Sequence, residues 1–187
     1  MSLPIIVGIS GATGVIYGVE LLRALKTLGH LTHLIITEMG IRTLAIETDV
    51  TLDELRSLAS VVHGNKDLAA SVSSGSFRTR GMIVAPCSVK TLSGIANSFA
   101  QNLLIRAADV TLKERRPLVL VFRETPLHLG HLRLMVRAAE MGATLLPPLP
   151  AFYSRPRSID DLIRQTVGRT LDQLGIEHSL AERWAGL

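Results

Sequence analysis

The chain has 187 residues and a mass of 20.2 kDa, and 47% of its residues are hydrophobic and 19% charged. This composition excludes an intrinsically disordered chain, and the length suits one substantial core, so we expect a single domain over residues 1–187. Twenty basic residues against 16 acidic ones give a net charge of +4, which favours an anionic partner, but only 4% of the residues are aromatic and no basic tract interleaves with them. Nucleic acid is therefore not the expected partner, and a small phosphorylated ligand is.

The first half of the chain alternates between strand-like and helix-like patterns. In order, the pattern predicts a strand at 5–9, a small-residue turn at 10–14, a helix at 15–28, a strand at 33–37 and a helix at 38–46. The polar stretch 49–76 has weak periodicity, and we expect it to hold one helix and a surface connection.

The second half continues the alternation. The pattern predicts strands at 82–85, 118–122 and 143–146, separated by helix-patterned segments. Four of the eight prolines lie within 145–156, which predicts a shaped loop, and Ser158 begins a last amphipathic helix that ends near Gly175. This order predicts an α/β fold in three αβα layers, with a parallel sheet covered on both faces.

Polar and small side chains follow each of the first four predicted strands. They are Ser10 to Gly14, Thr37, Pro86 to Thr91, and Arg123 to Pro126. Because ligands bind at the carboxyl ends of the strands in such sheets, these segments are the candidate site. The glycine turn and the helix start at Ser88 both offer backbone N–H groups to a phosphate. The glycine spacing matches neither the dinucleotide nor the P-loop fingerprint, so a tight turn without a ligand is the alternative for that motif alone.

Charged side chains supply the second set of candidates. Arg106 and Lys113 are seven residues apart and share one face of a predicted helix, whereas Arg115 and Arg116 are expected to complement its C-terminal dipole. The adjacent Arg123 and Glu124 combine an anion clamp with a proton-transfer group.

Several other reactive residue types have simpler explanations. Cys87, the single cysteine, cannot form an internal disulfide and is expected to be a small buried residue. His128 and His131 lack a third ligand at suitable spacing, so no metal site is expected. No apolar run approaches the ~18 residues that cross a bilayer, and the first four residues lack a secretory basic region, so we expect no membrane association and a cytoplasmic location.

In this order the motifs resemble the UbiX flavin prenyltransferase family over essentially the whole chain. The matching segments are Gly8 to Gly14, Ala85 to Leu92, Leu112 to Leu118, Arg123 to Leu127 and Pro150 to Tyr153. The resemblance implies a Rossmann-like or flavodoxin-like fold, a homo-oligomer that is usually a dodecamer, and no metal. It also implies transfer of a dimethylallyl group from dimethylallyl phosphate to N5 and C6 of reduced FMN. The prenylated FMN would serve UbiD-type decarboxylases, with ubiquinone biosynthesis as one setting.

The resemblance also assigns residues. Those implied to line the FMN are Gly11, Ala12, Thr13, Thr37, Ser88, Val89, Lys90, Thr91 and Arg123. Those implied to gather the prenyl phosphate are Arg106, Lys113, Arg123, Glu124, Tyr153 and Arg169.

The implied catalytic residues overlap with these two sets. Glu47 and Glu124 would handle protons, with Lys113 beside the phosphate, and Trp184 would face the allylic cation. Thr13 stands where many relatives carry serine, next to the flavin N5. The helix and tail over about 157–187 would lie at a subunit interface.

Two other functions compete with prenyl transfer. An FMN-dependent decarboxylase of aromatic or cysteinyl acids would need a carboxylate site in place of the cationic cluster. A non-catalytic FMN carrier would leave that cluster unexplained.

Overall fold

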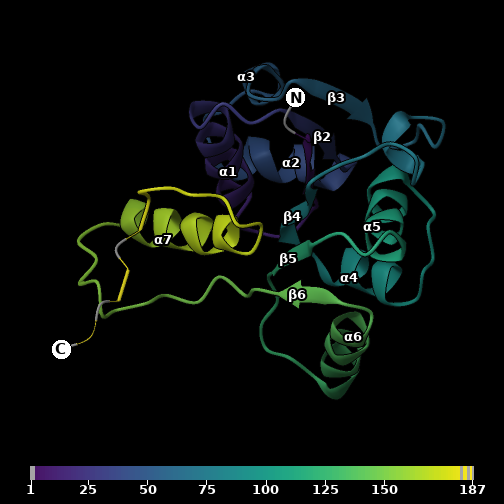
Figure 1. The fold of residues 1–187 in the computed structure, drawn as a ribbon. Helices are drawn as coiled ribbons and strands as arrows, with labels where there is room; N and C mark the ends of the chain where they lie inside the picture. The colour runs from purple at the N-terminus through teal and green to yellow at the C-terminus, as the bar shows by residue number, and fades with distance from the viewer. Residues whose placement is uncertain (1–2, 182, 185, 187) are drawn as a thin grey trace.

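Six parallel strands form the centre of the fold, in the order β3-β2-β1-β4-β5-β6. The computed structural model describes residues 3–181, 183, 184 and 186 (Figure 1). The strands are β1 (Ile5–Ile9), β2 (Thr32–Ile36), β3 (Val61–Gly64), β4 (Gly81–Cys87), β5 (Leu118–Phe122) and β6 (Ala143–Leu145). The predicted parallel α/β sheet is therefore confirmed.

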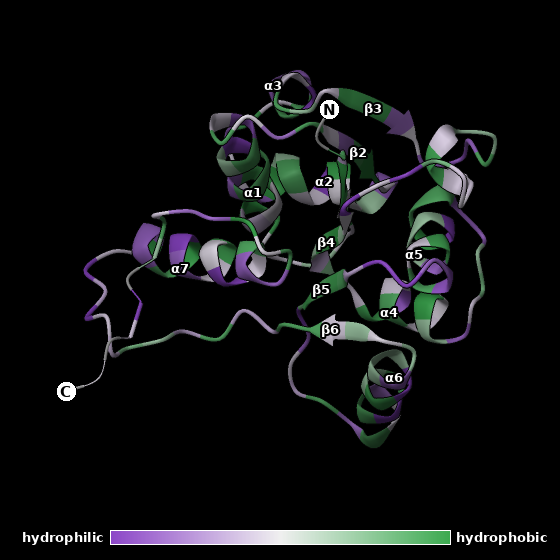
Figure 2. Ribbon diagram, in the orientation of Figure 1, coloured by the Kyte–Doolittle hydropathy of each residue, from purple (hydrophilic) through white to green (hydrophobic). Residues whose placement is uncertain are grey.

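Helices cover both faces of the sheet. They are α1 (Ile16–Thr27), α2 (Glu38–Glu47), α3 (Leu52–Ser57), α4 (Val89–Ala96), α5 (Leu103–Lys113), α6 (Leu129–Glu140) and α7 (Ile159–Asp172), with a short 3₁₀ turn at Ser71–Ser73. Apolar residues of α1, α2, α3 and α7 pack on one face, and those of α4, α5 and α6 on the other. In Figure 2 the helices carry both green, apolar and purple, hydrophilic stretches, as expected of helices with one face on the sheet and one in solvent. The αβα layering is as predicted.

Alternate residues of each central strand enter opposite cores. In β1, Ile5, Val7 and Ile9 join the α1/α7 core, whereas Ile6 joins the α4/α5 core. All five residues of β1 are buried, because a parallel sheet with two covered faces has no solvent side. This explains why the strands read as continuous apolar runs.

The strand β3 departs from the prediction for residues 49–76. That stretch contains the expected helix, α3, but also an edge strand that pairs only with β2. Val61 and Val62 in β3 are 40% and 39% exposed, so the strand carries no strong apolar pattern.

The strand order places a topological switch point between β1 and β4. The chain moves from β1 towards β2 and β3, then returns to pair β4 on the other side of β1. In open α/β sheets the crevice outside the carboxyl ends at such a point is where ligands bind. We call the segments that follow β1, β2, β4 and β5 the carboxyl edge. Among the helices that the structure describes, none has the length and apolarity to cross a membrane.

Candidate functional site

The loops after β1 and β4 are joined by one buried serine. Ser10 is 1% exposed, and its hydroxyl donates to the Pro86 carbonyl at 2.8 Å and accepts from the Ser88 backbone N–H at 2.8 Å. These two loops flank the switch point, and the Ser10 side chain, together with the Ser10 backbone N–H that donates to the Pro86 carbonyl at 3.2 Å, links them. Sequence reasoning named Ser10 only as part of the turn, because nothing in its local pattern reveals a partner 76 positions away.

The glycine turn is capped by an acid from α2. Glu47 Oε2 accepts hydrogen bonds from the backbone N–H groups of Gly14 at 2.8 Å and Val15 at 3.1 Å. Gly14 has φ +89°, a conformation that favours glycine, and Val15 supplies no side-chain cap to α1. The Glu47 carboxylate therefore occupies backbone N–H groups that the sequence pattern assigns to a phosphate. The same contact holds Glu47 beside the turn that contains Gly11, Ala12 and Thr13.

Two helices begin at the carboxyl edge with hydroxyl caps. Thr37 accepts from the Gly40 N–H at 3.0 Å at the start of α2, and its own N–H donates to the Ile9 carbonyl at 3.0 Å. Ser88 accepts from the Thr91 N–H at 3.3 Å at the start of α4. The partial positive charge of a helix start favours an anion, and Lys90 adds a full charge in the first turn of α4.

Arg123 and Glu124 follow β5 at the same edge. The Arg123 N–H donates to the Cys87 carbonyl at 3.1 Å, and Glu124 Oε1 accepts from the Thr125 N–H at 3.0 Å. Burial raises the pKa of Tyr17 in α1, and the nearby charge of Arg123 offsets part of that rise. Neither the Arg123 guanidinium nor the Lys90 ammonium makes a hydrogen bond or ion pair with any residue that the structure describes. The edge therefore presents two cations to an anionic ligand.

Cys87 lies below this surface as a packing residue. It is fully buried among the α4/α5 core residues, and burial raises the pKa of its thiol well above the ordinary range. The sequence interpretation of Cys87 as a small buried residue is confirmed, since a nucleophile would need a stabilised thiolate.

The two helix α5 cations bond partners other than the loops of the carboxyl edge. Arg106 donates to the Ser73 carbonyl at 3.2 Å and to Asp109 Oδ2 at 3.1 Å, and Lys113 pairs with Glu114 at 2.6 Å. Because α5 ends at Lys113 just before β5 begins, Lys113 lies at the opposite edge of the sheet. Among the described residues no hydrogen bond connects either cation to the loops of the carboxyl edge.

The remaining predicted site residues gather around α7 and the chain end. Tyr153 and Trp184 meet edge to face, with ring centroids 5.7 Å apart, and both rings are at least half exposed. Arg169 Nη1 donates to Asp172 Oδ2 at 2.8 Å. The structure thus places the predicted site residues in three regions: the carboxyl edge, helix α5, and α7 with the chain segments beside it (Figure 1).

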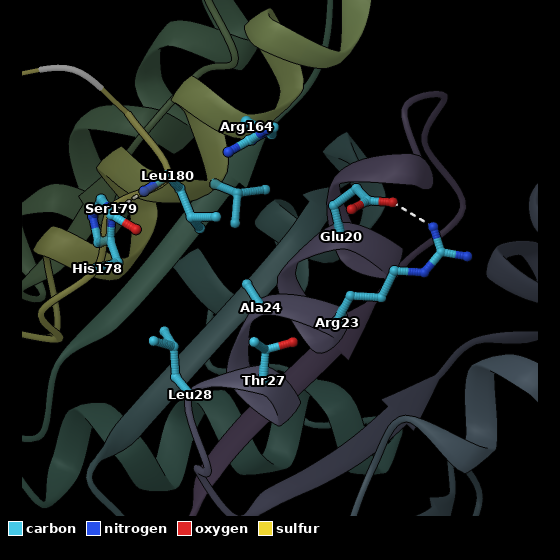
Figure 3. Close-up of a pocket in the computed structure, with 10 residues that line it drawn as sticks. Glu20, Arg23, Ala24, Thr27, Leu28, Arg164, His178, Ser179 and Leu180 are labelled. Carbon is cyan, nitrogen blue, oxygen red and sulfur yellow. Dashed lines mark hydrogen bonds and ion pairs between the residues drawn. The ribbon is translucent and has the colours of Figure 1, made fainter.

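A cavity of about 350 Å³ lies between α1, α7 and the tail segment 178–180 (Figure 3). None of the sequence-predicted site residues lines it. Its walls are Glu20, Arg23, Ala24, Thr27, Leu28, Arg164, Val167, His178, Ser179 and Leu180. Over residues 3–181, 183, 184 and 186, no group of three or more His, Cys, Asp or Glu side chains is placed to hold a metal ion.

Comparisons with known proteins agree with this geometry. A family model described as Flavoprotein matches residues 1–165. A protein of Thauera aromatica named "Flavin prenyltransferase UbiX" is 59% identical over 182 residues, which cover 97% of this chain and 94% of that protein.

Two solved structures extend the agreement to three dimensions. The structure of AnUbiX (PadA1) in complex with FMN and dimethylallyl pyrophosphate superimposes with a TM-score of 0.98 at 49% identity, covering 100% of both chains. A dodecameric FMN-dependent Ubix-like decarboxylase from Escherichia coli O157:H7 gives a TM-score of 0.96 at 48% identity, covering 98% of this chain and 100% of the other.

Proposed function

The chain belongs to the UbiX flavin prenyltransferase family, and on that premise we propose that it transfers a dimethylallyl group from dimethylallyl phosphate to reduced FMN. The observation that carries the proposal is the pair of loops at the β1/β4 switch point, which Ser10 joins. At the same edge are the cations Lys90 and Arg123, whose charged groups bond no residue that the structure describes. The AnUbiX structure, which matches the whole chain, holds FMN and dimethylallyl pyrophosphate.

The residues of the carboxyl edge fit FMN. Reduced FMN supplies the nucleophilic N5 and C6 that accept the prenyl group. The hydroxyl-capped start of α4, together with Lys90 and Arg123, would bind its phosphate through N–H groups and charge. The glycine turn, Thr37 and the segment Ser88 to Thr91 would hold and orient the rest of the molecule.

Proton handling falls to the two acids of the edge. Glu124 would protonate the departing phosphate, because a leaving group that gains a proton and cationic neighbours departs more readily. Glu47 already bonds the backbone at the glycine turn and would accept a proton beside Thr13.

The prenyl phosphate site would be built from more than one subunit. Lys113 precedes β5 at the amino end of the sheet, whereas Arg123 and Glu124 follow β5 at its carboxyl end, which favours a site that combines these residues from neighbouring chains. A dodecamer like that of the Escherichia coli relative would supply Arg106, Lys113, Tyr153 and Arg169 across subunit boundaries. Trp184 would then stabilise the allylic cation through its ring face.

The product would pass to a UbiD-type decarboxylase in the cytoplasm, with ubiquinone biosynthesis as one pathway that uses such an enzyme. The decarboxylase and carrier alternatives are not favoured, because relatives at 59% identity over nearly the whole chain are named flavin prenyltransferases.

The test is to incubate the protein anaerobically with reduced FMN and dimethylallyl phosphate and to analyse the flavin by mass spectrometry. We expect a flavin heavier by one prenyl unit, lost in Glu124→Gln and retained in Glu140→Gln, an exposed acid at the end of α6. Unmodified flavin despite tight FMN binding would overturn the proposal and support the carrier.

A further inference from the structure

One carboxylate ties the end of the chain back onto α7. Asp172 is the last residue of the helix, and its side chain is 15% exposed. Its Oδ2 accepts from Arg169 Nη1 at 2.8 Å, and its Oδ1 accepts from Arg183 Nη2 at 2.9 Å. The same Oδ1 lies 3.2 Å from His178 Nε2. Asp172 thus has three partners, two of them on the tail that begins at Gln173.

The histidine contact has a defined proton. His178 Nδ1 accepts from the Leu180 backbone N–H at 3.1 Å, so the proton of the neutral ring is on Nε2, facing Asp172. The His178 side chain is only 2% exposed, and it forms part of the wall in Figure 3. Its bond to Asp172 is therefore shielded from water and helps to set the path of the tail.

A glycine lets the tail approach the helix closely. A Cβ on Gly168 would lie 2.7 Å from His178 Cε1 and 3.2 Å from the Ala181 Cβ. Leu174 and Ile176 are buried in the α1/α7 core, which anchors the start of the tail. Packing thus fixes residues up to Ala181, and the ion pair of Arg183 with Asp172 adds a further contact with α7.

The residue after Arg183 is Trp184, which meets Tyr153 from the loop between β6 and α7. Asp172 therefore bonds Arg169, a residue of the proposed prenyl phosphate site. It also bonds Arg183, whose neighbour in the chain, Trp184, contacts Tyr153.

We propose that Asp172 is a positioning residue for the prenyl donor, which orients the Arg169 guanidinium and, through Arg183, places Trp184 against Tyr153. This inference rests on the proposed prenyl transfer and deepens it. The Asp172 carboxylate accepts from three donors and so stabilises one arrangement of Arg169, His178 and Arg183. The neutral amide of an asparagine, with a single acceptor oxygen, could keep only some of these hydrogen bonds. FMN would bind at the carboxyl edge, whose described loops make no hydrogen bond to this cluster.

The first experiment compares Asp172→Asn with Asp160→Asn, an exposed acid on the first turn of the same helix that loses the same charge. We expect Asp172→Asn to raise the KM for dimethylallyl phosphate by on the order of tenfold, with FMN affinity unchanged, because a charge-assisted but partly exposed bond is lost. Asp160→Asn should match the wild type. Asp172→Glu, which restores the charge, should recover part of the loss.

The second experiment reads the position of the tail directly. Trp184 is the single tryptophan, so acrylamide quenching of the fluorescence of the FMN-free protein reports its surroundings alone. We expect more quenching in Asp172→Asn and in Arg183→Gln, a change at an exposed side chain that should leave the fold intact. The double variant should be quenched no more than Asp172→Asn, since Arg183 acts through that carboxylate.

The outcomes separate this inference from the proposed function. If the wild type prenylates FMN, but Asp172→Asn and Arg183→Gln have the same KM for dimethylallyl phosphate as the wild type, the positioning role of Asp172 is wrong. If the wild type does not prenylate FMN, the proposed function fails and the donor role of Asp172 falls with it, while quenching still decides whether Asp172 places Trp184.

Discussion

Replacing Ser10 with alanine tests whether one hydroxyl holds the two loops of the switch point together. In this variant the Pro86 carbonyl keeps one partner, the Ser10 backbone N–H at 3.2 Å. The partly buried Ser88 N–H, however, loses the one acceptor that it has among the described residues. A buried donor left unsatisfied costs about 1–3 kcal/mol, and we take about 2 kcal/mol for this partly buried one. For a chain of 187 residues, a loss of about 2 kcal/mol lowers Tm by about 4–8 °C.

The assay is thermal unfolding at one fixed protein concentration, because subunit association also shifts Tm. FMN affinity, measured by quenching of flavin fluorescence, should fall as well, since the start of α4 loses its fixed position. Ser57→Ala is the control, because its hydroxyl is exposed and bonds only the Glu54 carbonyl one turn earlier. A Ser10→Ala protein with the Tm and FMN affinity of the control would refute the reasoning.

Three further results are expected. Gly168→Ala should lower the free energy of unfolding by about 1–3 kcal/mol, because the new Cβ would meet the His178 ring. Gly64→Ala is the control, since a Cβ there would meet no atom within 4 Å apart from its chain neighbours, and equal melting temperatures of the two variants would contradict the prediction. Because burial raises the pKa of Cys87, Ellman's reagent at pH 8 should label it only after denaturation, and prompt labelling of folded protein would count against that burial. Burial also raises the pKa of Asp172, but the hydrogen bonds and charges of Arg183 and His178 outweigh this effect and leave the pKa below the ordinary value of 3.8. The ionised Asp172 therefore stabilises the folded protein fully above about pH 4, and this stabilisation is lost as the pH falls through the lowered pKa. The Tm difference between wild type and Asp172→Asn should therefore shrink at pH 3, and an unchanged difference would argue against the ion pairs.

Local patterns predicted the parts of the fold that are buried on both sides. The apolar runs of β1, β4 and β5 stand out because no residue in them faces water, and Ser158 forms the predicted cap, as part of a capping box with Asp161. The edge strand β3 was missed for the opposite reason. It has one neighbour and half-exposed valines, so its sequence carries little of the periodicity that identifies strands.

The site was predictable as a set of loops but not as a set of contacts. The chain order of strands and helices brings the residues after β1, β2, β4 and β5 to one edge, because parallel strands share a direction. Helical spacing put Arg106 and Lys113 on one face, but spacing within α5 cannot tell which edge of the sheet that face approaches. The contacts of Glu47 with Gly14 and of Asp172 with Arg183 join separate elements, and no local pattern encodes them.

The pairing of β1 with β4 also has a consequence during synthesis. The Ser10 hydroxyl is 76 residues from the Pro86 carbonyl that it contacts, so the first strand leaves the ribosome long before its second neighbour exists. At translation rates of ~5–20 residues per second, that interval lasts roughly 4–15 s. Until then one side of β1 has unpaired backbone groups, so we expect the nascent N-terminal half to be prone to pair with other chains. The proposed ligand site also needs the loops after β4 and β5, so we expect flavin to stabilise the finished sheet and not the early stage of folding.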